Sequence, residues 1–148
     1  MDRQWYMRQA LELAREAAGD GEVPVGCVVA GPDGRILGRG RNRREREHDA
    51  TAHAELEAIR QACAARGTWR LDGCALYVTL EPCPMCAGAV INARIGQVVY
   101  GAKQANTGSC GSVLNLFEEN YGHRPAIYGG VLAEECQRLL QTFFEEKR

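Results

Sequence analysis

The middle of the sequence alternates between strands and helices, and this order constrains the fold more strongly than any other feature. Three short apolar segments, residues 25–30, 74–80 and 96–102, predict buried strands. Two segments with helical spacing of apolar side chains, residues 53–66 and 83–94, lie between them. Strands that alternate with helices form a sheet with helices on both faces. The sequence therefore predicts an α/β fold.

Further elements flank this unit. An apolar stripe over residues 4–18 predicts a first helix, and the turn sequence GPDG joins the first strand to a hairpin partner at residues 35–42. Residues 124–132 contain a short strand, and residues 133–148 close the chain as a helix. Because no repeat, linker or change of composition divides the sequence, we expect a single domain over residues 1–148.

Composition and charge narrow the class of protein. The chain has 148 residues, a net charge of −1 and no apolar run near the roughly 20 residues of a membrane span. Its start has acidic residues and no cleavage-site pattern, so we expect a cytoplasmic protein without a membrane anchor. Near-neutral charge gives no general attraction for nucleic acid, which would need a local patch. Five arginines between residues 39 and 46 are candidates, although a solvated loop explains them equally well.

The cysteines indicate a metal site. Seven cysteines at irregular spacing in a reducing cytoplasm leave metal binding or buried thiols as their roles. Cys83 and Cys86 share one face of an expected helix, whose N-terminus favours the thiolate that binds metals. Pro82 and Pro84 suit that helix start. With the imidazole of His53, two thiolates neutralise Zn²⁺ and leave a fourth position open, as in catalytic zinc sites.

Each half of this pattern also has a plainer explanation. A C-x-x-C pair alone is typical of a redox pair or of two core cysteines, and H-x-E alone is usually incidental. The combination of both at two helix starts is much more specific. The other cysteines, Cys27, Cys63, Cys74 and Cys136, are expected in the core, and the spacing of Cys110 offers no fourth ligand.

Glu55 is the candidate for proton transfer. It lies two residues after His53, which on a regular helix separates the two side chains by about 200°. They converge only if His53 stands at the start of the helix. Glu55 need not bind the metal, and its carboxylate can then act as general acid and base beside an activated water.

At these residues the sequence resembles the cytidine deaminase-like superfamily and, within it, the bacterial tRNA adenosine deaminases. The likeness covers nearly the whole chain, and its motifs are GEVPVG, GRGRN, DATAHAE, GTWRLDGCALYVTLEPCPMCAGAV, RIGQVVYGA and GVLAEECQRLLQTFF. H-x-E followed by P-C-x-x-C is the signature of zinc deaminases. The resemblance implies a three-layer α/β fold with a five-stranded mixed sheet between helices, in a homodimer.

The resemblance also implies a reaction and a set of site residues. His53, Cys83 and Cys86 would hold one Zn²⁺ per chain, and Glu55 would transfer protons. Water would replace the amino group of the wobble adenosine in a tRNA anticodon loop, which gives inosine. The implied substrate contacts are Asn42, the amide of Ala54, Pro82, Gln104, His123 and Phe144.

Two regions depart from the family pattern. Gln104 and Asn106 stand where family members commonly have an acidic residue and a lysine, and the last helix ends in EEKR instead of a basic tail. A second hypothesis, a deaminase of a free base or nucleoside such as guanine, cytosine or cytidine, therefore stays open. A third, a zinc-stabilised binding module without catalysis, has no use for the carboxylate of Glu55.

Overall fold

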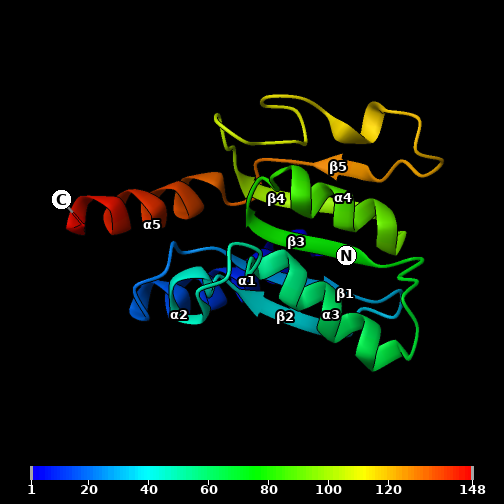
Figure 1. Ribbon diagram of the computed structural model, residues 1–148, viewed down its shortest axis with the longest axis horizontal. Helices are drawn as coiled ribbons and strands as arrows, with labels where there is room; N and C mark the ends of the chain where they lie inside the picture. Colours follow the sequence, from blue (N-terminus) through cyan, green and yellow to red (C-terminus); the bar gives the residue numbers. More distant parts are fainter. Residues whose placement is uncertain (1, 148) are drawn as a thin grey trace.

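The computed structural model, which describes residues 2–147, contains a five-stranded mixed sheet between two layers of helices (Figure 1). The strands are β1 (Gly26–Ala30), β2 (Ile36–Arg41), β3 (Ala75–Leu80), β4 (Gln97–Ala102) and β5 (Ala126–Tyr128). The helices are α1 (Arg3–Gly19), α2 (Arg44–Glu47), α3 (Ala54–Arg66), α4 (Pro84–Ala93) and α5 (Ala133–Glu146), with a 3₁₀ turn, η1 (Leu116–Glu118). Within these residues no helix has the length and apolar character that a membrane crossing requires. The expected three-layer α/β fold is confirmed.

The sheet gathers the ends of several strands at one edge. Its order is β2-β1-β3-β4-β5, with β1 antiparallel to both neighbours and β3, β4 and β5 parallel. Gly26 lies opposite Arg41, and Leu80 lies opposite Ala102. The segments that follow β2, β3 and β4 therefore leave the sheet from the same edge, where the segment that precedes β1 also arrives.

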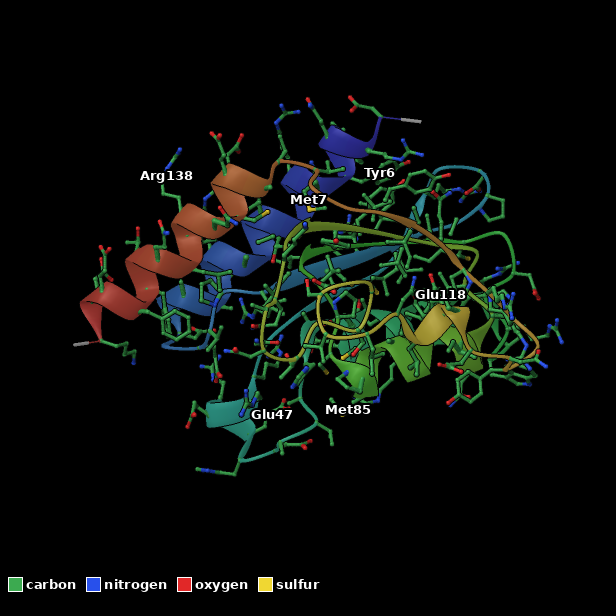
Figure 2. The ribbon with its side chains drawn as sticks, turned by 90° about the horizontal axis from the view of Figure 1, so that it is seen from above. Tyr6, Met7, Glu47, Met85, Glu118 and Arg138 are labelled. Carbon is green, nitrogen blue, oxygen red and sulfur yellow. The ribbon has the colours of Figure 1, made fainter. Side chains whose placement is uncertain are left out.

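An apolar core lies on each face of the sheet, because successive side chains of a strand point to opposite faces. Leu76 and Val78 of β3 pack in the cluster under α3 and α4. Tyr77, between them, packs in the other cluster, where its ring stacks on Tyr6 of α1 with centroids 4.7 Å apart. Figure 2 shows α1 and α5 side by side over that second face.

Glycines in β2 bring α3 unusually close to the sheet. A Cβ atom at Gly40 would lie 2.1 Å from the carbonyl oxygen of Ala54, and one at Gly38 would lie 2.0 Å from that of Ala58. Only glycine permits this approach of helix and strand backbones. The first turn of α3 is thereby held against the end of β2, at the edge where the strand ends gather.

Two short elements were not predicted. The four-residue helix α2 lies inside the arginine-rich segment, for which a solvated loop was one explanation, and the turn η1 lies in a stretch for which no element was predicted. The buried carboxylate of Glu22 accepts hydrogen bonds from the amides of Glu45 (3.0 Å) and Arg46 (2.8 Å), which satisfies donors at the start of α2. This cap comes from outside the local sequence, so local sequence patterns gave no sign of the helix.

Candidate metal centre and catalytic cavity

Two helix starts face each other at the sheet edge, and each contributes one candidate ligand. His53 is the N-cap residue of α3 and Cys83 that of α4, both with extended backbone (φ −88°, ψ 150° and φ −76°, ψ 173°). Neither side chain caps its own helix, so both are free to point into the space between the helices. Pro84 occupies the first turn of α4, and Cys86 follows in the same turn.

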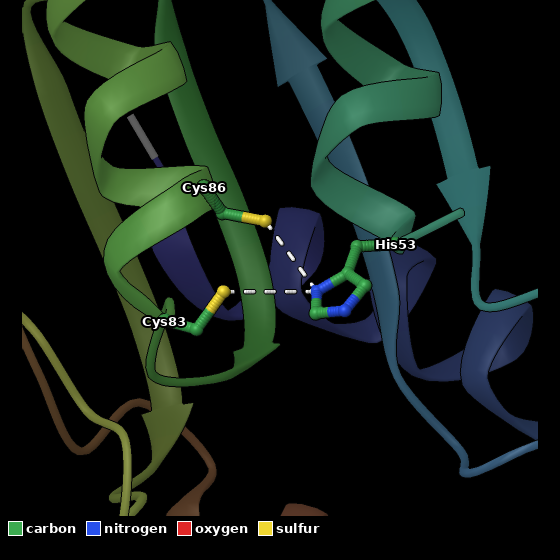
Figure 3. Close-up of side chains that lie close together, drawn as sticks. All are labelled: His53, Cys83 and Cys86. Carbon is green, nitrogen blue, oxygen red and sulfur yellow. Dashed lines mark hydrogen bonds between the residues drawn. The ribbon is translucent and has the colours of Figure 1, made fainter. Parts of the chain in front are cut away.

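The three candidate ligand atoms converge on one point (Figure 3). The Nδ1 atom of His53 lies 3.8 Å from the Sγ atom of Cys83 and 3.6 Å from that of Cys86. A tetrahedral zinc ion with ordinary Zn–N and Zn–S bonds separates such atoms by about 3.6 Å. The donor set and its spacing therefore fit Zn²⁺. No other group of three such side chains clusters within residues 2–147, so a closed four-ligand site has no candidate there.

The electrostatics of the two thiols suit a metal site. A hydrogen bond from Cys86 and another with His53 lower the pKa of Cys83 to about 4, although burial opposes the shift. The same bond to Cys83, together with burial, raises the pKa of the Cys86 thiol. The hydrogen bond with Cys83 raises the pKa of His53. The Cys83 thiolate is thus prepared before any metal binds, whereas Cys86 must release its proton when the metal binds.

Glu55 is buried beside these groups. Its side chain is 3% exposed in the first turn of α3, and it lines the same cavity as His53 and Cys83. Burial raises its pKa, an effect that the positive charge of His53 partly offsets. A buried carboxyl group whose pKa is raised holds a proton more readily than a free one, which suits a group that must both accept and return a proton in general acid–base catalysis.

The cavity over this site has a volume of about 220 Å³. Its lining comprises Val23, Val25, Asn42, Arg44, His53, Glu55, Leu80, Glu81, Cys83, Gln104, Thr107 and Phe144. Three of the expected substrate contacts, Asn42, Gln104 and Phe144, are therefore brought together with the candidate ligands. Phe143 is buried, whereas the neighbouring Phe144 is 50% exposed and available for contact.

Asn42 and Ala54 are connected to each other. The side-chain oxygen of Asn42 accepts a hydrogen bond from the Ala54 amide (3.0 Å), and its nitrogen donates to the carbonyl of Val23 (3.2 Å). The Ala54 amide, expected as a direct substrate contact, is thus already used within the protein. Asn42 therefore lines the cavity and also connects two backbone segments beside it, at Ala54 and Val23.

Pro82 and His123 do not line the cavity. The Pro82 carbonyl accepts a hydrogen bond from the Ser109 amide (2.9 Å). His123 bonds through Nε2 to the Ile95 carbonyl (2.7 Å), just before β4 begins. Because the cavity lies where β4 ends, the structure separates His123 from it by the length of that strand. A short sequence around a loop histidine carries no signal for which end of the sheet the loop reaches.

Two charged residues of the cavity were missed as site residues. Arg44 was noted only as part of the arginine cluster, and Glu81 was not singled out. Glu81 is 2% exposed, and burial alone would raise its pKa, but hydrogen bonds from Ser112, Gln104 and Cys110 bring that pKa below its usual value. The only available signal was its position next to the C-x-x-C motif.

Residues 1–102 match the family described as the cytidine and deoxycytidylate deaminase zinc-binding region. The chain therefore belongs to this family of zinc deaminases, in agreement with its fold and with the site formed by His53, Cys83 and Cys86. Among curated proteins it is 49% identical to the tRNA-specific adenosine deaminase of Bacillus subtilis, over 97% of this chain and 89% of that protein.

Solved structures give the same fold. One, from a study of A-to-I editing by tRNA:A34 deaminases at the wobble position of transfer RNA, superimposes with a TM-score of 0.87 at 43% identity, covering 92% of this chain and 99% of that one. The guanine deaminase of Nitrosomonas europaea superimposes with a TM-score of 0.82 at 27% identity, over 95% of this chain and 83% of that one.

Some relatives are much longer. The chain is 53% identical, over 96% of its length, to a protein of Deinococcus deserti named tRNA(Ile)-lysidine synthase. It spans only 27% of that relative's length. The match therefore covers one part of a larger protein.

Proposed function

We propose that this protein is a zinc-dependent hydrolase that converts adenosine to inosine at the wobble position of a tRNA anticodon loop. The observation that carries the proposal is the near full-length identity with the Bacillus subtilis tRNA-specific adenosine deaminase. A buried Glu55 beside a three-ligand site supports the same chemistry, because a merely structural zinc site has no use for that carboxylate.

Different side chains of the cavity have different roles in the proposed reaction. Zinc held by His53, Cys83 and Cys86 would supply a Lewis acid that activates water at neutral pH. Glu55 accepts the proton of that water and delivers it to the ring nitrogen of adenine. Once the water oxygen has bonded to the ring carbon, Glu55 takes the second proton of that oxygen and gives it to the amino group. The bond between the ring carbon and the amino group then breaks, and a carbonyl remains. Water and adenosine thus give inosine and ammonia.

Access to a base within an anticodon loop requires the base to leave its stack. Phe144, half exposed at the cavity, offers an aromatic surface for stacking. Arg44 brings a positive charge to the same cavity for a neighbouring phosphate. Three other arginines of the cluster, Arg41, Arg43 and Arg46, form ion pairs with acidic side chains. Of the other two, Arg39 and Arg44, only Arg44 lines the cavity, so the positive charge at the cavity comes from Arg44.

A deaminase of a free base is the second candidate, favoured by the structural likeness to a guanine deaminase. Both substrate classes present an amino group on a carbon next to a ring nitrogen, so the metal site does not separate them. The test incubates the zinc-loaded protein with an anticodon stem-loop that carries a wobble adenosine, and separately with guanine, cytosine, cytidine and adenosine. Ammonia release from the stem-loop alone supports the proposal, and release from a free base or nucleoside alone supports the second candidate.

We further propose that the protein acts in the cytoplasm as a homodimer. The outward face of α4 supports this assembly, since Met85, Gly88 and Ala89 are only partly buried and carry no charge. Light scattering of the purified protein tests it, with a mass of twice 16.3 kDa expected. A mass of a single chain at micromolar concentration would contradict it.

A further inference from the structure

The segment between β4 and η1 forms one wall of the cavity without regular secondary structure. Residues 103–112 contain only turns and an isolated bridge, yet Gln104 and Thr107 from this segment line the cavity. A wall without helix or strand hydrogen bonds needs another source of order if it is to meet a substrate in a fixed position.

That source is a single buried carboxylate. Glu81 directly follows β3, and its Oε1 atom accepts hydrogen bonds from the Gln104 amide (3.1 Å) and the Ser112 hydroxyl. Its Oε2 atom accepts from the amides of Cys110 (3.0 Å) and Ser112 (3.0 Å). Four donors from both ends of the segment therefore meet on one side chain. With two donors on each oxygen, little capacity is left for a metal or for proton transfer.

Close packing reinforces these bonds. A Cβ atom at Gly108 would lie 2.5 Å from the Oε2 atom of Glu81, so the segment wraps around the carboxylate at a position where only glycine fits. The adjacent peptide takes part as well, because the Pro82 carbonyl accepts from the Ser109 amide (2.9 Å) and the Glu81 amide donates to the Ala102 carbonyl (2.8 Å).

The same short stretch carries a metal ligand. Only Pro82, whose ring restricts its backbone, separates Glu81 from Cys83. The short stretch of backbone that carries Glu81, which orders the cavity wall, therefore also carries Cys83, a candidate metal ligand. We propose that Glu81 is a positioning residue, which fixes residues 103–112 so that Gln104 and Thr107 meet the substrate at a set distance from the metal centre.

The proposal rests on the proposed function for its kinetic test only. Glu81→Gln keeps the size of the side chain but turns one acceptor oxygen into a donor, which then faces amide donors. The metal ligands and Glu55 are unchanged. We expect KM for the wobble stem-loop to rise about tenfold or more, with kcat within about threefold of wild type, because the lost contacts act on substrate binding.

Two readouts separate this role from a general loss of structure. In the zinc-loaded protein without substrate, amide exchange of Gln104, Cys110 and Ser112 should become at least about tenfold faster in Glu81→Gln, while amides of α3 keep their protection. In the cobalt-substituted protein, the thiolate-to-metal absorption should match that of wild type. The matched control is Glu118→Gln, which changes an exposed carboxylate of η1 and should leave kinetics and exchange unchanged.

Two further variants keep the test valid if Glu81→Gln does not fold. Gly108→Ala pushes the segment away from the carboxylate by steric contact, and Ser112→Ala removes one donor; both should raise KM, the second by only about two- to threefold. A fall in kcat with unchanged KM and intact amide protection would overturn the proposal, as would no change in any variant. If wild-type protein does not act on the stem-loop, the proposed function fails, and amide exchange alone decides the role of Glu81.

Discussion

The side-chain oxygen of Asn42 accepts a hydrogen bond from the backbone amide of Ala54 at 3.0 Å, which joins the end of β2 to the start of α3. The side-chain nitrogen of Asn42 donates to the carbonyl of Val23, just before β1. One buried amide therefore connects three segments that meet at the cavity, directly beside the candidate ligand His53.

Asn42→Ala should destabilise the protein by about 1–3 kcal/mol, because it leaves the buried Ala54 amide without a partner and removes one of the two donors to the Val23 carbonyl, which keeps the Val25 amide. Asn42→Asp keeps an acceptor for Ala54 but directs a second oxygen at the Val23 carbonyl, so it should also lose stability. Thermal unfolding of the zinc-loaded variants measures both effects, with the exposed Asn120→Ala as control. An Asn42→Ala variant as stable as wild type would show that these bonds contribute nothing.

The purified protein should contain about one zinc per chain, and His53→Ala or Cys86→Ser should lose both the metal and the activity. Zinc affinity should fall as the pH is lowered, because Cys86, whose pKa is raised in the metal-free site, must release a proton to bind zinc. Elemental analysis and zinc titration at several pH values measure these effects. A protein with no zinc, or with a fourth protein ligand, is incompatible with the site described above.

Glu55→Gln should retain zinc and fold but lose turnover by a factor of about 10²–10⁴, which is the usual contribution of a general acid–base group. The substitution keeps the size of the side chain in its buried position, so only proton transfer is removed. Single-turnover rates on the true substrate, measured together with zinc content, test the assignment. Retention of more than about a tenth of the wild-type rate would show that another group moves the protons.

We predict that Gln104 makes the protein discriminate less sharply between RNA and DNA substrates than an acidic residue at this position would. Its side-chain oxygen accepts a hydrogen bond from the Asn106 amide (3.1 Å), so its amino group is left as the contact for a substrate. In Gln104→Asp one carboxylate oxygen can make that local bond, and the other can accept from a ribose 2′-hydroxyl.

Charged hydrogen bonds exceed neutral ones by about 1 kcal/mol, so Gln104→Asp should widen the RNA-to-DNA rate ratio about five- to tenfold. Matched RNA and DNA stem-loops, each with one adenosine at the wobble position, give the ratio directly. The same ratio in both proteins would mean that residue 104 does not face the sugar.

The sequence predicted the metal centre well because its determinants are local. Prolines beside Cys83 indicated a helix start, and the short spacing of His53 and Glu55 required His53 to stand at another. The alternation of strands and helices predicted the sheet on which both helices pack. Each of these inferences depends on neighbours within a few residues, where sequence patterns are informative.

The walls of the cavity could not be predicted in the same way. The carboxylate of Glu22 holds α2 from 23 residues away, and Glu81 holds the Ser112 amide from 31 residues away. Hydrogen bonds between segments that are far apart in the sequence produce no periodic pattern of residues from which they could be predicted. The position of His123, bonded to the Ile95 carbonyl at the opposite end of β4 from the cavity, was unpredictable for a related reason, since a loop residue can bond to either end of its neighbouring strand.

We propose that the protein deaminates one adenosine of an anticodon loop. The most direct measurement incubates the zinc-loaded protein with a tRNA whose anticodon loop has adenosine at the wobble position and at a second, neighbouring position. Mass spectrometry of the digested loop then locates each product. We predict inosine at the wobble position alone, and none with Glu55→Gln. No inosine in the tRNA, together with ammonia release from a free base or nucleoside, would contradict the claim.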